Sequence, residues 1–402
     1  MYKNTKSFRT NSFRSSGRTS FGGFRPNRSR FSAKKRGDSI DESKYISKAN
    51  PSVVESIKIE NRFEDFAFSS QLNKNLSDRN YSIPTPVQDK SIKPIMEGRD
   101  VVALADTGTG KTGAFLLPLI DLCFKQRNKK ALIIAPTREL AQQIESEFKK
   151  FAVAMGLYSA VCVGGVPIYR QIESLRRRPN FVIGTPGRLK DMKTRKLIDF
   201  GSFDFVVLDE IDRMLDMGFV EEITKILDEL PENKQSLFFS ATIPPKIREL
   251  VNKFLKNPAT VQVSNGNSSK NVDQDIVRVS NDQKFDKLKE LLITKELQKV
   301  LIFIETKHEA ERVSAELIKD GFKADSIHGD KRQSQRQKAL MRFKQSEIQI
   351  LVATDVAARG LDIDNVTHVI NYTLPQTYND YVHRIGRTGR GEKTGFALTF
   401  VS

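Results

Sequence analysis

Short apolar runs that alternate with helical patterns are the feature that most constrains the fold of this chain. From Arg99 onward, β-branched and apolar residues gather in runs expected to form buried strands over 101–105, 131–135, 181–184, 205–208 and 236–239. Between two of these runs, the apolar residues Leu140, Ile144, Phe148 and Phe151 recur at helical spacing and predict one face that covers a sheet. Strands buried on both faces and separated by helices are typical of a parallel sheet, so we expect an α/β domain.

A second α/β unit follows a polar stretch. After Val263 the sequence Ser-Asn-Gly-Asn-Ser-Ser-Lys-Asn has no hydrophobic period, which is typical of a flexible linker. Strand-like runs resume at 300–304, 350–353, 366–370 and 396–400, with helical patterns over 307–319 and 332–345. The pattern lacks the eight regular units of a barrel. We therefore predict two doubly wound parallel-sheet domains, over 61–263 and 276–402, with a linker over 264–275.

The N-terminal region has a different composition. Residues 1–37 contain eleven Lys or Arg and no Asp or Glu, so they carry +11 of the net charge of +17. Five Phe lie among Gly and Ser, often beside Arg, which opposes folding and suits phosphate contact and base stacking. We expect residues 1–60 to be a disordered basic tail and residues 1–37 of it to bind RNA; the alternative is a tail that only improves solubility. An organellar transit peptide is also Arg- and Ser-rich, but Gly22, Gly23 and Pro26 break an amphipathic helix.

The cysteine content and hydropathy exclude several protein classes. Cys123 and Cys162 lie among apolar neighbours without a CxxC partner, so we expect neither a zinc site nor a disulfide framework. No window approaches the ~18 apolar residues of a membrane span, and the apolar core of a secretory signal is missing. These features predict a soluble cytoplasmic protein with no membrane partner. The excess of positive charge, taken alone, favours a polyanionic partner, either nucleic acid or an acidic membrane surface.

The segment from Ala105 to Thr112 reads Ala-Asp-Thr-Gly-Thr-Gly-Lys-Thr and lies between a strand-like run and a helical pattern. In this context backbone N–H groups converge on phosphate oxygens at a helix N-terminus. Lys111 would reach the β- and γ-phosphates, and the Thr112 hydroxyl would ligate Mg²⁺. Ala105 stands where the usual pattern has its first Gly. A loop that served only as a connection would not need Gly-Lys-Thr, so the segment predicts a nucleoside triphosphate site.

Two carboxylates follow the run 205–208, at the sheet edge where such folds bind ligands. Asp209 suits Mg²⁺, through a water. Glu210 would accept a proton from, or orient, the water that attacks the γ-phosphate. Without the upstream phosphate loop, Asp-Glu after a strand is more often a helix cap.

Taken in order, the motifs over about residues 60–402 resemble those of the DEAD-box ATP-dependent RNA helicases of superfamily 2, and somewhat those of the bacterial RhlE-like group. The resemblance implies two RecA-like domains, with ATP and Mg²⁺ between them and RNA across both. One departure is Ile211, where the family name has Ala, which puts the placing of Asp212 in question. The other is that the chain stops soon after the run 396–400, so a face of the second sheet is expected to be poorly covered or covered by a partner.

The resemblance assigns the ATP site. Phe63 with the segment 81–88 is similar to the family's adenine-reading segment, with an aromatic ring on the base and Gln88 at its edge. On chemistry alone, Tyr81 and Gln88 would be ordinary residues flanking a helix. The implied ATP-binding residues are Phe63, Tyr81, Gln88, Ala105, Asp106, Thr107, Gly108, Thr109, Gly110, Lys111, Thr112, Asp209, Gly360 and Asp362. The implied metal ligands are Thr112 and Asp209, and the implied catalytic residues are Lys111, Glu210, Arg387 and Arg390.

The resemblance also assigns RNA contacts and coupling residues. The RNA-side motifs are strand ends and turns with N–H or guanidinium donors, which suit sugar-phosphate contacts, although each motif alone is equally consistent with turn or capping chemistry. The implied RNA-binding residues are Pro136, Thr137, Arg138, Gly165, Thr185, Pro186, Gly187, Arg188, Gln333, Arg336, Thr354 and Asp355. The implied coupling residues between the ATP and RNA sites are Asp212, Ser240, Thr242 and His383.

The expected function is an RNA-dependent ATPase that unwinds or remodels RNA duplexes and RNA–protein complexes locally, through ATP-driven closure of two domains. Its partners would be single-stranded or short duplex RNA without sequence preference, and ribosomal or RNA-decay proteins, with the protein acting as a monomer. Two alternatives remain: a translocating or DNA-directed helicase on the same fold, and a non-catalytic RNA chaperone that acts through the basic tail.

Overall fold

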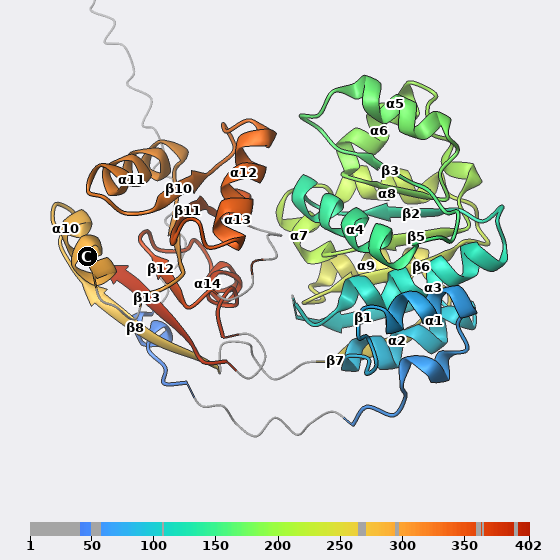
Figure 1. Ribbon diagram of the computed structural model, residues 1–402, viewed down its shortest axis with the longest axis horizontal. Coiled ribbons are helices and arrows are strands. Elements are labelled where there is room, and N and C mark those ends of the chain that lie inside the picture. Colours follow the sequence, from blue (N-terminus) through green and yellow to red (C-terminus); the bar gives the residue numbers. More distant parts are fainter. Residues whose placement is uncertain are drawn as a thin grey trace, which may run out of the picture. The chain divides into compact units, whose positions relative to one another are not determined.

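The computed structural model describes residues 41–49, 58–106, 108–263, 271–293, 297–358, 363, 366–389 and 393–402. They form two α/β domains, each built on a parallel sheet (Figure 1), so the predicted fold class is confirmed. The predicted RNA-binding tail over 1–37 lies outside the described residues, as do four predicted site residues: Thr107, Gly360, Asp362 and Arg390. Among the residues described, no helix combines the length and apolar character needed to span a bilayer.

The first domain contains a seven-stranded sheet in the order β3-β4-β2-β5-β6-β1-β7, with every neighbouring pair parallel. Its strands are β1 Val101–Ala105, β2 Ala131–Ile134, β3 Ser159–Cys162, β4 Phe181–Gly184, β5 Phe205–Leu208, β6 Gln235–Ser240 and β7 Ala259–Val263. The five predicted strands are present, each within one residue of its predicted ends. The edge strands β3 and β7 were not predicted, because alternate residues are only partly buried and no continuous apolar run marks them.

Helices cover both faces of this sheet. They are α1 Ser70–Ser77, α2 Pro86–Met96, α3 Lys111–Lys125, α4 Arg138–Phe151, α5 Ile168–Arg176, α6 Pro186–Thr194, α7 Ile211–Asp216, α8 Val220–Asp228 and α9 Pro245–Phe254, with 3₁₀ turns at Phe63–Phe66 and Phe200–Ser202. One apolar core contains residues of α1 to α4, and the other contains residues of α6 to α9. The four apolar residues predicted to line one face of a helix all lie buried on α4, which confirms that pattern.

The second domain contains a six-stranded parallel sheet in the order β10-β11-β9-β12-β13-β8. Its strands are β8 Val272–Arg278, β9 Val300–Ile304, β10 Ala324–Ile327, β11 Ile350–Thr354, β12 His368–Asn371 and β13 Gly395–Val401. Its helices are α10 Lys284–Ile293, α11 Lys307–Lys319, α12 Gln333–Lys344, α13 Asp355–Ala358 and α14 Tyr378–Ile385. The predicted linker over 264–275 was too long, because its last residues belong to β8, a half-exposed edge strand with a polar sequence.

The segment 41–49 also corrects the prediction, which placed it in a disordered tail. Glu42–Tyr45 forms a 3₁₀ turn, and Ser47 pairs with Gln274 on β8. Tyr45 is buried in a cluster with residues of β8, β13 and α14. One face of the second sheet was expected to be poorly covered or covered by a partner. Tyr45 packs against residues of β8 and β13, so part of the cover of these strands comes from the N-terminal part of the same chain.

Candidate functional site

The carboxyl ends of the strands in the first domain carry nearly all of its predicted site residues. Each of the six strands from β1 to β6 ends at, or one to three residues before, a predicted residue: Asp106, Pro136, Gly165, Thr185, Asp209 and Ser240. Because these strands are parallel neighbours, their carboxyl ends meet at one edge of the sheet. The fold thus brings together the residues predicted for ATP and those predicted for RNA along a single edge.

The phosphate loop joins β1 to α3 at this edge. Gly110 has a φ of +94°, in the left-handed region that favours glycine, and it is the N-cap of α3. A Cβ atom at Gly110 would lie 2.7 Å from Nε2 of Gln88 and 2.8 Å from Oγ1 of Thr85. The left-handed backbone together with these close contacts favours glycine at this position, at the N-terminus of a helix, as a phosphate site requires.

Gln88 connects the predicted adenine segment to the phosphate loop. Its Nε2 donates to the carbonyl oxygen of Gly110 at 3.1 Å, and its Oε1 accepts from the Thr85 amide at 2.9 Å. Phe63 differs from the prediction of a stacking ring, because it is only 2% exposed and belongs to the apolar core. Tyr81, which is 39% exposed and packs near Phe63, is the aromatic side chain of this segment that is open to a base.

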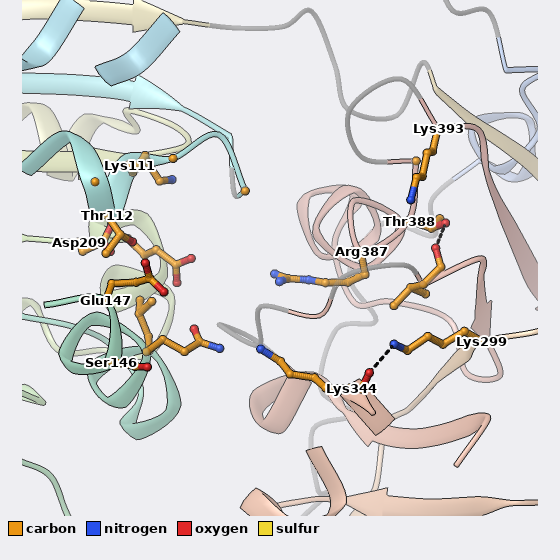
Figure 2. A pocket seen from close by; sticks show the side chains of 18 of the residues that line it. Lys111, Thr112, Ser146, Glu147, Asp209, Lys299, Lys344, Arg387, Thr388 and Lys393 are labelled. Atoms are coloured by element: carbon orange, nitrogen blue, oxygen red, sulfur yellow. Dashed lines mark hydrogen bonds between the residues drawn. The ribbon is translucent and has the colours of Figure 1, made fainter. Parts of the chain in front are cut away.

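Lys111 and Asp209 lie together at the base of the loop (Figure 2). Lys111 is buried, and its Nζ donates to the carbonyl oxygen of Ala105 at 2.8 Å. Asp209 is 2% exposed, and its Oδ1 atom has no hydrogen-bond partner among the described residues. Burial raises the pKa of Asp209, while Lys111 acts in the opposite direction and Glu210 raises the pKa further. A buried carboxylate oxygen without a partner fits a hard cation such as Mg²⁺, and Thr112 lies at the same sheet edge, in the first turn of α3.

Glu210 occupies the sharp turn between β5 and α7. Its φ is +54°, an uncommon value for a residue other than glycine, and such strain is concentrated at functional sites. Its Oε2 accepts a hydrogen bond from Nη1 of Arg213, and both side chains are buried. Arg213 was not predicted; its only sequence signal is its position three residues after Glu210, which is the N-cap of α7. This contact fixes the direction of the Glu210 carboxylate.

Asp212 and the Ser240–Thr242 segment form one hydrogen-bonded group. Oδ2 of Asp212 accepts from the amides of Ala241 and Thr242 at 3.0 and 2.9 Å, and the Thr242 hydroxyl lies 3.3 Å away. The Ser240 hydroxyl accepts from the Asp212 amide at 3.3 Å. Ile211 is buried in the apolar core beside α7. The larger residue therefore fits the core, and Asp212 remains bonded to the segment with which it was predicted to couple.

The RNA-side residues of the first domain are turn and cap residues. Thr137 caps α4 by accepting from the Leu140 amide at 3.3 Å, and Pro186 opens α6. Gly165 has a φ of +70°, and a Cβ atom there would overlap the Arg138 guanidinium. The predicted residues Arg138 and Gly165, from different motifs, therefore lie against each other, and Gly187 and Arg188 lie in the first turn of α6.

In the second domain, Arg384 holds the segment around the predicted Arg387. Its Nε and Nη2 donate to the two carboxylate oxygens of Asp355, each at 2.7 Å, and Nη1 donates to the Thr373 carbonyl oxygen at 2.7 Å. Asp355 was predicted to contact RNA, yet here it binds Arg384, a residue that the motif contained but that received no role. Arg387 follows α14 by two residues, and the Thr388 hydroxyl anchors the turn on the Val366 carbonyl oxygen at 2.6 Å (Figure 2).

The other predicted residues of this domain lie on two helices and one strand end. Gln333 and Arg336 are in the first turn of α12, three residues apart and so on the same side of the helix. His383 lies on α14, and Thr354 is the last residue of β11. Gly360, Asp362 and Arg390, which lie outside the described residues, remain predictions.

Comparison with known families gives two matches. Residues 85–250 match the DEAD/DEAH box helicase family, and residues 283–392 match the helicase conserved C-terminal domain. The two matched segments fall in the first and second domain respectively; of the described candidate residues, only Phe63 and Tyr81 lie outside them.

Curated relatives and solved structures agree with these matches. The chain is 43% identical over 343 residues to the ATP-dependent RNA helicase CshA of Limosilactobacillus reuteri, covering 85% of this chain and 69% of that protein. It is 42% identical to CshA of Listeria monocytogenes, covering 85% of this chain and 66% of that protein. The structure of Saccharomyces cerevisiae Dbp5 bound to RNA and ADP BeF3 matches with a TM-score of 0.74 at 28% identity, over 84% of this chain and 89% of that chain. None of these matches bears on the RhlE-like subgroup, which stays a prediction.

Proposed function

Since the chain belongs to the DEAD-box family of ATP-dependent RNA helicases, we propose that it separates short RNA duplexes locally, through ATP-driven closure of its two domains. The observation that carries this proposal is the single sheet edge of the first domain. There the phosphate loop, the Asp209–Glu210 pair and the RNA-side turns follow neighbouring parallel strands. The nucleotide and the RNA would thus bind next to each other along this edge.

The first domain would bind the nucleotide. The N–H groups of the loop and the Lys111 ammonium would hold the phosphates, and Thr112 and Asp209 would hold Mg²⁺, which would neutralise charge on the β- and γ-phosphate oxygens. Gln88 and Tyr81 would select adenine. Glu210, whose carboxylate Arg213 holds in a fixed direction, would orient the attacking water and accept its proton.

The second domain would complete the site. Arg387, with Arg390, would supply guanidinium groups to the γ-phosphate when the domains close, and such arginines are worth about 10³–10⁵ in rate in phosphate-loop enzymes. Closure would require RNA, because RNA contacts come from both domains, and hydrolysis would therefore depend on RNA. The group formed by Asp212, Ser240 and Thr242 would relay the state of the nucleotide to the RNA side.

RNA would be held without sequence preference. Caps, turns and guanidinium groups such as Thr137, Arg138 and Arg188 suit the sugar-phosphate backbone and carry little sequence information. Contact between the basic tail and phosphates would keep the substrate nearby and would weaken with salt. The monomeric state, the cytoplasmic location and any ribosomal or RNA-decay partners remain predictions.

The test is steady-state ATP hydrolysis by the full chain with no nucleic acid, with single-stranded RNA and with DNA of the same length, at two salt concentrations. We expect stimulation by RNA that falls with salt. Stimulation by DNA equal to that by RNA would support a DNA-directed helicase instead. Glu210→Gln should lower the RNA-stimulated rate; a normal rate in this variant would refute the assigned base.

The chaperone alternative is tested by RNA strand annealing. If annealing survives Lys111→Ala but is lost when residues 1–37 are deleted, the tail alone carries the activity. If Lys111→Ala abolishes both ATP hydrolysis and duplex separation, the proposed ATP-driven function is supported.

A further inference from the structure

Residues 41–49, which we call the strap, pack on the second domain although residues 58–263 that follow form the first (Figure 1). The strap pairs with β8, an edge strand. The Ser47 amide donates to the Gln274 carbonyl oxygen at 3.0 Å, and the Gln274 amide donates to the Ser47 carbonyl oxygen at 2.7 Å. The Ala49 amide donates to Oδ1 of Asp273 at 2.8 Å. The strap thus adds a short antiparallel bridge to the free edge of a parallel sheet.

Tyr45 anchors the strap. Its side chain is 2% exposed, and its ring meets the Tyr381 ring edge-on, with the centroids 4.8 Å apart. Val272, Ile385 and Ala397 complete this cluster. An aromatic residue buries more apolar surface than any other side chain type, so Tyr45 dominates the strap's attachment. Burial also raises the pKa of Tyr45, and the hydroxyl stays protonated at neutral pH.

The remaining contacts of the strap are exposed and weaker. Glu42 pairs with Arg278 at 2.7 Å, and Nζ of Lys44 lies 5.6 Å from the centroid of the Tyr378 ring. Surface pairs of this kind contribute little to stability, so these contacts add little to the free energy with which the strap binds the second domain.

The cluster around Tyr45 touches the helix that leads to Arg387. Tyr381 and Ile385 belong to α14, which ends two residues before Arg387. The Tyr381 hydroxyl donates to Oε1 of Gln274, the strand residue that pairs with the strap. The helix α14 is also held by Arg384, which binds Asp355. Among the described residues, α14 is thus held by its own sheet through Arg384 and Tyr381, and it also contacts the strap through Tyr45.

We propose that the strap is a positioning element for ATP hydrolysis, with Tyr45 as its positioning residue. By filling the cluster beside Tyr381 and Ile385, Tyr45 fixes the position of α14. It thereby fixes the position of Arg387, which follows the end of that helix by two residues. This inference rests on the proposed role of Arg387. Removal of the Tyr45 ring leaves the nucleotide contacts of the first domain intact, so the effect should appear in kcat and not in KM for ATP.

The experiment compares Tyr45→Ala and Tyr45→Phe in the full chain, with Tyr158→Ala as the control. Tyr158 is 60% exposed on the first domain, so its removal tests the loss of a tyrosine ring outside the strap. Tyr45→Ala should lower the RNA-stimulated kcat about tenfold, within the ~10²-fold that a 1 Å misplacement can cost, with KM for ATP within about twofold. Tyr45→Phe, which keeps the ring, and Tyr158→Ala should both retain the kcat of the unaltered protein.

A double-mutant cycle with Arg387→Ala separates this inference from the proposed function. If Arg387→Ala leaves kcat unchanged, the proposed role of Arg387 fails. If Arg387→Ala lowers kcat and Tyr45→Ala does not, the strap inference alone is overturned. If both lower kcat, the double variant should be no slower than Arg387→Ala; a further tenfold loss would show that the strap acts independently of Arg387 and would also overturn the inference.

Hydrogen exchange of backbone amides reports the docking directly. The amides of Ser47 and Gln274 should be protected in the unaltered protein and should exchange faster in Tyr45→Ala, while amides of β9 stay protected. If β9 also loses protection in Tyr45→Ala, the second domain is destabilised as a whole and the kcat of that variant no longer tests the strap. The Ser47→Pro variant then provides the test. That variant removes the amide that donates to Gln274 without altering the cluster, and an unchanged kcat despite loss of Gln274 protection would overturn the inference.

Discussion

Replacing Asp355 with Ala tests whether this residue holds the second domain together, as the structure indicates, or contacts RNA, as its motif predicts. The change removes both carboxylate oxygens that accept from Arg384 at 2.7 Å. Arg384 is 2% exposed, so its guanidinium would remain buried without a counter-charge. Removing one partner of a buried pair is far more costly than losing a surface pair, because the other charge stays desolvated.

The expected loss follows from the contacts that remain. Breaking a buried ion pair costs about 3–5 kcal/mol. Nη1 of Arg384 keeps its hydrogen bonds to Thr373 and Asn371, and the Asp355 side chain is 23% exposed, so we expect a loss near the lower end, about 3 kcal/mol. With a urea dependence of about 1–3 kcal/mol per M, the unfolding midpoint of the second domain should fall by about 1–3 M.

The assay is hydrogen exchange of the β9 amides at increasing urea, which reports the second domain alone. Glu290→Ala is the matched control, because Glu290 pairs with Lys287 at 2.8 Å on the exposed face of α10 in the same domain. This surface pair should contribute less than about 1 kcal/mol. A midpoint for Asp355→Ala that falls no further than that of Glu290→Ala would refute the reasoning. Weaker RNA binding without any loss of stability would restore the predicted RNA contact.

Three other substitutions have outcomes set by the structure. Gly110→Ala should abolish ATP binding, measured by equilibrium titration, because its Cβ would strike Gln88 in a left-handed turn; Gly98→Ala, at φ +78° with open space around it, controls for backbone strain alone. Burial raises the pKa of Asp209 from 3.8 to about 7, so stability falls as pH rises between these values; without nucleotide, the gain in unfolding temperature of Asp209→Asn over the unaltered protein should be larger at pH 8 than at pH 5, and this variant should bind Mg²⁺-ATP weakly. Burial lowers the pKa of His368 to about 4, so the second domain should lose stability as pH falls from about 6.5 to 4, and His368→Phe should flatten this dependence in urea titrations.

The sequence predicted the central strands well and the edges poorly. β1, β4, β5 and β9 have the predicted bounds, because a strand buried on both faces is a continuous apolar run. The strands β3, β7, β8 and β10 lie at or next to the sheet edges and are partly exposed, so polar residues interrupt their patterns. Their positions depend on which neighbour they pair with, which the local pattern does not contain.

The site residues were likewise predicted where the local sequence marks them and missed where their contacts are distant in the chain. Residues that sit directly after a central strand, such as Asp209 and Glu210, could be assigned from their position in the sequence. The burial of Phe63, the pairing of Asp355 with Arg384 and the docking of Tyr45 could not, because each depends on contacts between segments far apart in the chain. Tyr45 in particular is a lone aromatic residue in a polar stretch, with no periodicity to mark it as buried.

The docking of Tyr45 has a consequence for the order of events on the ribosome. Tyr45 leaves the exit tunnel early, but its partner Tyr381 is more than three hundred residues further along the chain. At roughly 5–20 residues per second, roughly 15–70 seconds pass before that partner has been made. The whole first domain is synthesised in this interval, so it can fold as a unit before Tyr45 docks, and the second domain reaches its final form only when α14 has been made and meets Tyr45.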